Sequence, residues 1–380
     1  MNSIKLLEKL VSFDTVSSKS NLELVSWVTE LLGKHGIEYR LTTNDEGTKQ
    51  NIFASVGPRV SGGVILSGHT DVVPVVGQEW KSDPFTLTER DGRLYGRGTC
   101  DMKGFIASAL AALIKASAQP LSKPLYLALS YDEEIGCLGV PRLIDDIADI
   151  IPRPRAVIIG EPTEMQPITQ HKGSFRSKIC LTGKAGHSSQ PSLGVSAIHY
   201  AGKVLQGLSE YADELKASPY KDSALNPNYT VINTGLISGG TAPNVFAQNC
   251  EMTLATRFMP TETVGTHKLK FERIVSDVEK RMQNHAPECS AQVVIENNIP
   301  AFKPEENSEA VKICELLVGP RPSGAVGFGT EAGHFQEAGF STVVFGPGSI
   351  NQAHQANEFI EIEQMNAIDE CLAKLIDLQM

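Results

Sequence analysis

Short apolar runs alternate with helical patterns along the first 175 residues of the chain. Three of these runs, at residues 64–68, 125–129 and 156–160, are rich in Val, Ile, Leu and Ala and are bounded by Gly or Pro. Such runs indicate buried strands of a parallel sheet, because both faces of these strands are covered. We therefore predict an α/β fold in which helices flank a mostly parallel sheet.

The pattern changes near residue 176, where apolar and polar positions begin to alternate along the strands. The predicted elements are a strand at 176–182, a helix at 195–215, strands at 229–237 and 249–257, a charged helix at 262–283 and a strand at 291–296. This β-α-β-β-α-β order is typical of a ferredoxin-like α+β domain.

The first pattern returns after residue 298, with helices at 308–317 and 361–378 and a strand at 341–345. We therefore predict a catalytic domain formed by residues 1–175 and 298–380. It is interrupted by an inserted α+β domain, residues 176–297. A length of 380 residues is consistent with two domains.

Polar residues follow the three apolar runs of the predicted parallel sheet. His69 and Asp71 follow the first run, Glu133 and Glu134 the second, and Glu161 the third. Ligands of open α/β sheets bind beyond the carboxyl ends of the strands, so these side chains are expected at one edge of the sheet.

Asp101 adds a further carboxylate just before a helical pattern that begins near residue 104. Carboxylates gathered at one buried edge repel one another unless a cation neutralises them. Each residue also has an ordinary explanation: His69 and His354 as structural or loop histidines, the Glu133–Glu134 pair as a solvated loop, Glu161 as a turn. The shared strand-end position of most of them favours a metal site.

Other classes of function find little support in the sequence. A net charge of −10 argues against nucleic acid or an anionic membrane as the main partner. No apolar stretch approaches the roughly 20 residues that span a bilayer. The chain lacks the Gly-x-Ser-x-Gly motif of a serine hydrolase, and its glycine-rich segment 96–104 lacks the Gly-Lys-Ser/Thr ending of a P-loop.

The expected location is the cytoplasm. The first ten residues carry charges among their apolar positions and predict an amphipathic helix instead of a signal peptide. Seven cysteines without a Cys-x-x-Cys pair indicate reduced thiols.

Six motifs make the chain resemble a known family. They are Gly-His-Thr-Asp (68–71), Gly-Arg-Gly-Thr-Cys-Asp-Met-Lys-Gly (96–104), Asp-Glu-Glu (132–134), Gly-Glu-Pro-Thr (160–163), Gly-His-Ser-Ser (186–189) and the late His354. The chain resembles the two-metal aminoacylase and carboxypeptidase-like hydrolases, which include acetylornithine deacetylase and succinyl-diaminopimelate desuccinylase.

The resemblance implies a role for each residue of the predicted site. By this resemblance, Asp101 bridges two divalent ions. The peptide bond after Asp101 is expected to be cis. His69 and Glu161 complete one metal site. Glu134 and His354 complete the other.

In the same family, the residue at the position of Glu133 is the general base, and that of Asp71 orients the first histidine. Two histidines and three carboxylates suit zinc, with cobalt or manganese as alternatives.

The resemblance also implies a homodimer, in which His187 of the inserted domain reaches the active site of the partner subunit. Arg257 and Asn244 correspond to residues that bind the substrate carboxylate, a role that suits the planar guanidinium of arginine. Without the resemblance, His187 would be interpreted as a turn histidine and Arg257 as a solvated strand end.

Residues 13–17, 171–173 and 330–332 resemble the branch of the family that hydrolyses N-acetyl-L-ornithine to L-ornithine and acetate in arginine biosynthesis. In the last of these segments, Glu331 is a candidate for binding the terminal ammonium group of that substrate. The alternatives are a desuccinylase, another N-acyl amino acid amidohydrolase or a dipeptidase. An inactive metal-stabilised scaffold is a remote alternative, because a scaffold has no use for Glu133.

Overall fold

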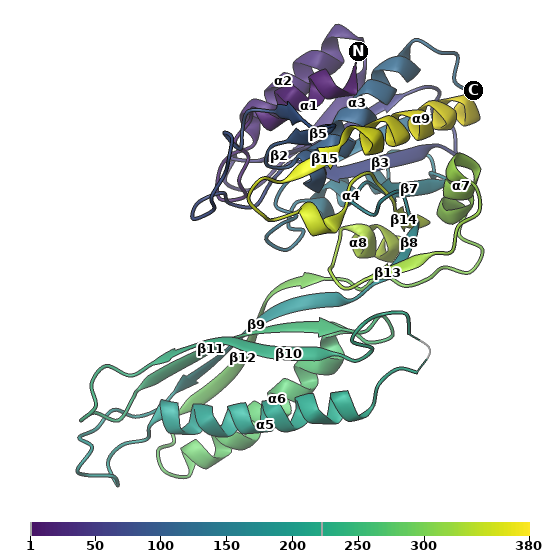
Figure 1. Ribbon diagram of the computed structural model, residues 1–380. Helices are drawn as coiled ribbons and strands as arrows, with labels where there is room; N and C mark the ends of the chain where they lie inside the picture. The colour runs from purple at the N-terminus through teal and green to yellow at the C-terminus, as the bar shows by residue number, and fades with distance from the viewer. Residues whose placement is uncertain (1, 222) are drawn as a thin grey trace. The chain divides into compact units, whose positions relative to one another are not determined.

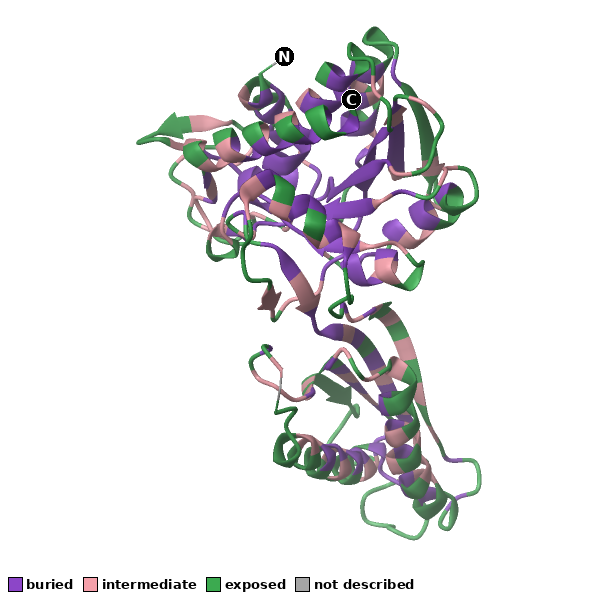
Figure 2. Cartoon of the chain, turned by 90° about the vertical axis from the view of Figure 1, so that its right-hand side faces the viewer, coloured by how far each residue is buried: buried purple, intermediate pink, exposed green. Residues whose placement is uncertain are grey.

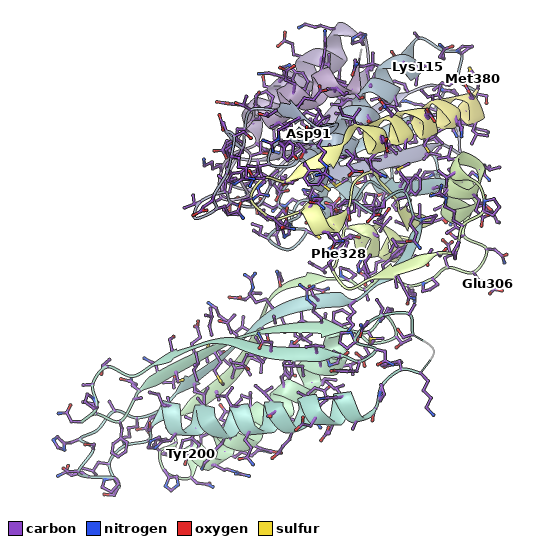
Figure 3. All side chains as sticks on the ribbon, viewed as in Figure 1. Asp91, Lys115, Tyr200, Glu306, Phe328 and Met380 are labelled. Carbon is purple, nitrogen blue, oxygen red and sulfur yellow. The ribbon has the colours of Figure 1, made fainter. Side chains whose placement is uncertain are left out.

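The computed structural model describes residues 2–221 and 223–380. Met1, the first residue of the predicted N-terminal helix, lies outside the described residues. The chain forms two compact units. The first unit comprises Met1–Thr169, Pro304–Ala325 and Thr330–Met380, and the second comprises Gln170–Lys303 and Val326–Gly329. Phe328, labelled in Figure 3, belongs to the short second segment of the second unit.

An eight-stranded sheet organises the first unit, with strand order β1-β2-β6-β3-β7-β14-β8-β13 (Figure 1). Its central strands are β3 (Val64–His69), β6 (Leu125–Ser130), β7 (Ala156–Ile159) and β14 (Thr342–Val344). They run parallel, and all their residues are buried. The predicted parallel sheet is thus confirmed in its centre, where apolar runs are covered on both faces.

Antiparallel strands flank this parallel centre. They are β1 (Glu38–Thr43) and β2 (Gln50–Val56) on one side and β8 (Ile168–His171) on the other. β13 (Gly324–Val326) follows β8 at the edge of the sheet. None of these four strands was predicted from the sequence.

Helices cover both faces of the sheet. The helices of the first unit are α1 (Ser3–Val11), α2 (Leu22–Lys34), α3 (Gly104–Ser117), α4 (Val140–Ala148), α7 (Glu309–Val318), α8 (Ala332–Glu337) and α9 (Ile362–Gln379). Apolar residues of α1, α2, α3, α7 and α9 form one core with every second residue of β3 and β6. The buried residues of α4 lie outside that core, and α4 packs against β1, β2, β6 and α8.

A small three-stranded sheet was not predicted from the sequence. Its order is β15 (Phe359–Glu361), β5 (Arg93–Tyr95) and β4 (Thr88–Arg90), and its strands pair antiparallel. Strands of three residues are too short to show a period. This sheet brings the chain after residue 95 next to the chain before residue 359.

The second unit has the predicted β-α-β-β-α-β order. Its elements are β9 (Gly173–Thr182), α5 (Ala197–Ala217), β10 (Val231–Gly239), β11 (Asn249–Phe258), α6 (Val264–Gln283) and β12 (Ser290–Ile299). The strands form an antiparallel sheet in the order β10-β11-β9-β12. Buried and more exposed residues alternate along β9 and β11, as Figure 2 shows, because only one face of the sheet packs against α5 and α6.

Among the described residues, no helix combines the length and the apolar character needed to cross a membrane.

Candidate metal centre

The central strands of the first unit end in polar residues at one edge of the sheet. β3 ends at His69, which pairs in register with Ser130 at the end of β6. Glu133 and Glu134 lie in the turn after β6, and Glu161 comes two residues after the end of β7. Because these strands are parallel, the fold brings all four side chains to the same edge.

Asp101 reaches this edge from a different element. A π-helical turn, Thr99–Lys103, precedes α3, and within it Asp101 has φ −124° and ψ 92°, which are not helical values. The peptide bond between Asp101 and Met102 is cis, as the family resemblance implied. The Asp101 side chain is buried beside the ends of the strands.

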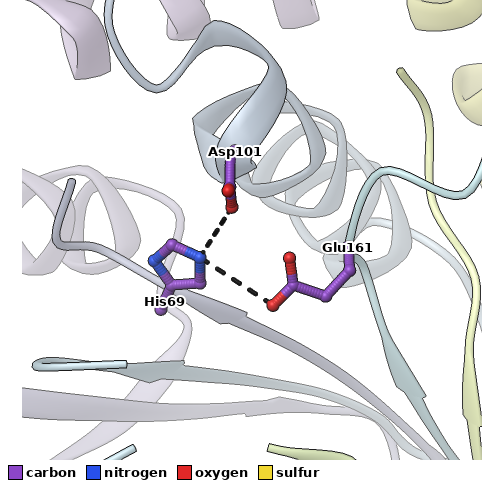
Figure 4. A group of neighbouring side chains, drawn as sticks. All are labelled: His69, Asp101 and Glu161. Atoms are coloured by element: carbon purple, nitrogen blue, oxygen red, sulfur yellow. Dashed lines mark hydrogen bonds and ion pairs between the residues drawn. The ribbon is translucent and has the colours of Figure 1, made fainter. Parts of the chain in front are cut away.

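His69, Asp101 and Glu161 form the first group of candidate ligands (Figure 4). His69 Nε2 lies 3.0 Å from Asp101 Oδ1 and 3.8 Å from Glu161 Oε1. One ligand atom from each residue lies within 4.8 Å of the others, and all three residues are buried. The spacing lets one ion contact all three side chains after small adjustments.

Asp101, Glu134 and His354 form the second group. His354 Nε2 lies 3.3 Å from Asp101 Oδ2 and 3.0 Å from Glu134 Oε2. His354 is the exposed member, with 54% of its side chain accessible. Asp101 presents one oxygen to each group, so its carboxylate has the arrangement of a bridge between two ions.

Asp71 organises the site through two kinds of contact. Its main-chain oxygen lies 3.0 Å from His69 Nδ1, closer than its carboxylate, which lies 3.6 Å away. The carboxylate instead accepts hydrogen bonds from the main-chain N–H groups of Glu133 and Glu134, at 3.1 and 3.3 Å. Asp71 therefore positions the Glu133–Glu134 turn as well as the ring of His69.

The electrostatics of the two groups show an excess of negative charge. Hydrogen bonds to Asp101 and Glu134 raise the pKa of His354 to about 10. Burial would raise the pKa of Asp101, but hydrogen bonds from His354 and His69 hold that pKa well below its ordinary value. Burial and the nearby Asp101 raise the pKa of Glu134 to about 7 and that of Glu161 well above its ordinary value.

These side chains fit divalent cations. Two imidazole nitrogens and three carboxylates are ligands that zinc accepts. The shifted pKa values mean that the cluster is stabilised by positive charge, here the protons of the two histidines. A divalent ion can supply that charge instead, and both histidines would then bind as neutral ligands.

Glu133 lies beside these groups without belonging to either. Burial raises the pKa of its carboxyl well above the ordinary value, and the negative charge of Glu134 adds to the effect. The thiol of Cys137 donates to Glu133 Oε1 at 3.4 Å. Glu133 is therefore a buried carboxyl group of raised pKa, next to both groups of candidate metal ligands.

Two contacts of the site, those of Ser17 and Cys137, were not expected from the sequence. Ser17 Oγ donates to Asp71 Oδ2 at 2.7 Å, and Ser17 closes the segment 13–17 that had served only to choose a branch of the family. Cys137 reaches Glu133 because the turn gives Cys137 a left-handed backbone with φ 55°, a conformation that the sequence pattern does not reveal.

Glu331 lies in the first unit and is only 1% exposed. Ser130 Oγ, at the end of β6, donates to Glu331 Oε1 at 2.5 Å, and Ser67 Oγ lies 3.5 Å from Oε2. Burial raises the pKa of Glu331 to about 7. This burial was not predicted from the sequence.

The other predicted residues lie in the second unit. His187, Asn244 and Arg257 are all exposed. The main-chain N–H of Ser188 donates to the carbonyl oxygen of Asn244 at 3.0 Å, so the segments that carry His187 and Asn244 lie side by side. Arg257, near the end of β11, pairs in register with Val231 of β10.

Comparison with known families identifies the class of protein that this fold and site define. Residues 65–378 match the family described as peptidase family M20/M25/M40. The match covers most of the chain, and the chain belongs to this family of metal-dependent peptidases and amidohydrolases.

Solved structures with the same fold span nearly the whole chain. A metallo-carboxypeptidase of the M20 family from Sulfolobus solfataricus is 18% identical, with a TM-score of 0.76 and coverage of 100% of this chain and 99% of its own. A tripeptidase from Staphylococcus aureus is 19% identical, with a TM-score of 0.75 and coverage of 99% and 97%. A Bacillus subtilis protein, described as a dinuclear metal-binding peptidase from the M20 family, is 16% identical, with a TM-score of 0.70 and coverage of 99% and 97%.

Proposed function

We propose that the protein is a two-metal amidohydrolase that removes the acyl group from N-acyl amino acids, with N-acetyl-L-ornithine as its preferred substrate. The products are L-ornithine and acetate, and the enzyme is an acetylornithine deacetylase. The observation that carries the proposal is the position of Glu133, a carboxyl of raised pKa beside two ligand groups that share Asp101.

The metal ions, zinc or alternatively cobalt, would be held by His69, Asp101 and Glu161 in one site and by Asp101, Glu134 and His354 in the other. When bound, two such ions lower the pKa of water and stabilise negative charge that develops on a carbonyl oxygen. This chemistry suits amide hydrolysis, the reaction class of the peptidases that share the fold.

Glu133 transfers the proton in this proposal. Its carboxylate takes a proton from the attacking water and returns it to the nitrogen of the leaving amine. A general base works best when its pKa lies near the working pH, and the raised pKa of Glu133 moves it in that direction. Asp71 holds the main chain of Glu133 in place.

Recognition of the substrate is proposed to involve Arg257, Asn244 and Glu331. The exposed guanidinium of Arg257 suits the α-carboxylate of an amino acid, with Asn244 as a second polar contact. Glu331 is proposed to recognise the terminal ammonium group of the ornithine side chain. Because Glu331 is buried, such an ion pair would be stronger than a hydrated one.

A homodimer formed through the second unit is part of the proposal. β10 is an edge strand of the antiparallel sheet, and Leu236 and Ile237 on it are 70% and 52% exposed. An edge strand offers unpaired N–H and C=O groups, and antiparallel pairing with the same strand of a second copy satisfies twofold symmetry. Each subunit would then contribute His187 to the active site of the other, where it helps to stabilise the oxyanion.

A peptidase is the second candidate function, because the names of the structural neighbours favour it. They include the tripeptidase from Staphylococcus aureus and also a dipeptidase from Saccharomyces cerevisiae. A free amino terminus is what distinguishes their dipeptide and tripeptide substrates from an N-acyl amino acid.

A substrate panel tests the proposed function. The metal-loaded enzyme is assayed with N-acetyl-L-ornithine, N-acetyl-L-methionine, N-succinyl-diaminopimelate, a dipeptide and a tripeptide. We expect the highest kcat/KM for N-acetyl-L-ornithine with added zinc or cobalt. A much higher value for the succinylated substrate or for a peptide would replace the proposed activity with that of a desuccinylase or a peptidase.

A further inference from the structure

A fully buried ion pair lies next to the segment that carries Asp101 of the candidate metal centre. Arg97 Nη1 donates to Glu358 Oε2 at 2.7 Å, and each side chain is only 1% exposed. Arg97 lies two residues after β5, and Glu358 lies directly before β15. The pairing of these two short strands brings the ion pair together. None of the roles assigned above involves either residue.

The Glu358 carboxylate accepts hydrogen bonds from the backbone around Asp101. Its Oε1 accepts hydrogen bonds from the main-chain N–H groups of Cys100 and Asp101, at 2.9 and 3.1 Å. Its Oε2 accepts from the main-chain N–H of Gly98 at 3.1 Å, in addition to the guanidinium of Arg97. One carboxylate thus fixes the turn whose aspartate is shared by both ligand groups.

Arg97 extends the same network toward His354. Its Nη2 donates to Gln78 Oε1 at 2.5 Å, and its Nη1 also lies 3.3 Å from the carbonyl oxygen of Gln355. Gln78 Nε2 in turn donates to the carbonyl oxygen of His354 at 2.9 Å. His354 itself has a left-handed backbone, with φ 63°, a conformation that the surrounding contacts must hold in place.

The network therefore joins the two ligands of the second group that no strand of the central sheet positions. The ends of β3 and β7 place His69 and Glu161, whereas Asp101 and His354 lie on a π-helical turn and a loop. A buried ion pair is by itself weak evidence of a contribution to stability, because desolvation offsets the attraction between the charges. A more specific use of the Arg97–Glu358 pair is to fix the positions of Asp101 and His354, the two ligands that lie on irregular segments.

We propose that Arg97 and Glu358 are positioning residues that set the metal affinity of the centre. Glu358 acts on both ions through Asp101, and Arg97 acts on the second ion through Gln78 and His354. The inference rests on the proposed two-metal function. Residues that orient metal ligands typically change affinity 10–100-fold when they are replaced.

Glu358→Gln tests the first half of this proposal. Whichever way the new amide turns, its NH₂ group faces either the N–H groups of Cys100 and Asp101 or those of Arg97 and Gly98, so one pair of donors loses its acceptor. We expect zinc affinity, measured by chelator competition on the metal-free protein, to fall about 10–100-fold for both ions.

Glu361→Gln is the matched control, because Glu361 lies three residues further on and its side chain is 48% exposed. We expect its two dissociation constants to equal those of the unmutated protein. If Glu358 had only a structural role, Glu358→Gln would lower the melting temperature of the metal-free protein and leave its two zinc dissociation constants unchanged.

Gln78→Ala tests the second half and keeps the ion pair intact. We expect it to weaken only one of the two ions, with Glu79→Ala as the control. If Glu358→Gln does not fold, Gln78→Ala still decides the second half, because unchanged dissociation constants for both ions would overturn the role of Arg97.

Folded variants that bind both ions as tightly as the unmutated protein would overturn the inference. The proposed function would remain in that case, because the unmutated protein still binds two ions. An unmutated protein that binds no divalent ion would overturn the proposed function itself, and the inference with it.

Discussion

Each candidate ligand owes its position to a specific local cause. His69 ends a buried strand, Glu161 follows another, and Glu134 lies in a turn whose N–H groups are held by Asp71. Because these residues directly follow apolar runs, their convergence could be predicted from the sequence. The surroundings of Glu331 could not be predicted, because its two serine partners are more than 200 positions away along the chain.

The role of Glu331 is tested by the variant Glu331→Gln. The amide keeps the size of the side chain and removes its charge, so an ion pair with the ornithine ammonium is lost. Since the site is buried, we expect the ratio of kcat/KM for N-acetyl-L-ornithine to that for N-acetyl-L-methionine to fall about tenfold, which corresponds to about 1.4 kcal/mol. Equal losses on the two substrates would remove Glu331 from substrate recognition and leave it a structural partner of Ser130.

At the scale of elements, the longer helices and strands were predictable because their periods extend over several residues. α5, α6 and β11 begin within two residues of their predicted starts. The sheet of β4, β5 and β15 was missed because each strand has three residues. The Arg97–Glu358 pair was missed for the same reason, since the pairing of β5 with β15 brings the two residues together.

Glu262 contacts four segments of the second unit and gives this unit a dependence on pH. Its carboxylate accepts from Tyr220 Oη at 2.9 Å and from the main-chain N–H of Met259 at 3.1 Å, and it also contacts Thr230 and His267. Burial would raise the pKa of Glu262, but these hydrogen bonds outweigh it and lower the pKa from 4.5 to about 2.

The lowered pKa predicts a loss of stability in acid. The folded form binds a proton on Glu262 more weakly than the unfolded form does. The contribution of Glu262 to the free energy of unfolding is therefore complete above pH 4.5 and disappears as the pH falls toward 2. Since a tenfold change in proton affinity corresponds to about 1.4 kcal/mol, the loss is on the order of 3 kcal/mol.

Hydrogen exchange of peptides from α6, measured between pH 6 and pH 3, isolates this effect from the titration of the metal centre. We expect α6 protection to decline with acid in the unmutated protein and to be lower and nearly independent of pH in Glu262→Gln. Glu272→Gln, on the same helix and exposed, is the control. Identical pH profiles for Glu262→Gln and the control would show that Glu262 does not stabilise the unit through its charge.

At the scale of the whole molecule, the two units divide the proposed work. The first unit holds both ligand groups and Glu133, and the second holds His187, Asn244 and Arg257. The resemblance to a dimeric family predicts that His187 acts in the partner subunit. The order of elements in the second unit was predictable, but the exposure of the apolar edge strand β10 was not, because sequence alternation does not show which strand lies at the edge.

Leu236→Lys tests the proposed dimer by placing a charge on the exposed edge of β10. We expect the variant to be a monomer by light scattering, whereas Val294→Lys, on the opposite edge strand β12, remains a dimer. A monomeric unmutated protein, or a dimeric Leu236→Lys variant, would contradict a dimer formed through β10.

A mixing experiment tests the contribution of His187 to the neighbouring subunit. The variants His187→Ala and Glu133→Gln are each inactive in this account, but a dimer of one with the other contains one complete site. An equal mixture that exchanges freely is expected to regain about a quarter of the unmutated activity, because half of the dimers are mixed and half of their sites are complete. Verified mixed dimers without any recovery would place His187 outside the chemistry of the partner subunit.

The central claim is that Glu133 moves the proton while its neighbour Glu134 holds metal, and one measurement tests it most directly. Glu133→Gln is loaded with zinc, its metal content is determined, and its turnover of N-acetyl-L-ornithine is measured on the same preparation, beside Glu134→Gln. The account predicts that Glu133→Gln keeps two ions per subunit and loses turnover by about 10²-fold or more, whereas Glu134→Gln loses one ion. A Glu133→Gln protein that loses metal as Glu134→Gln does, or that retains near-normal turnover with both ions bound, would contradict it.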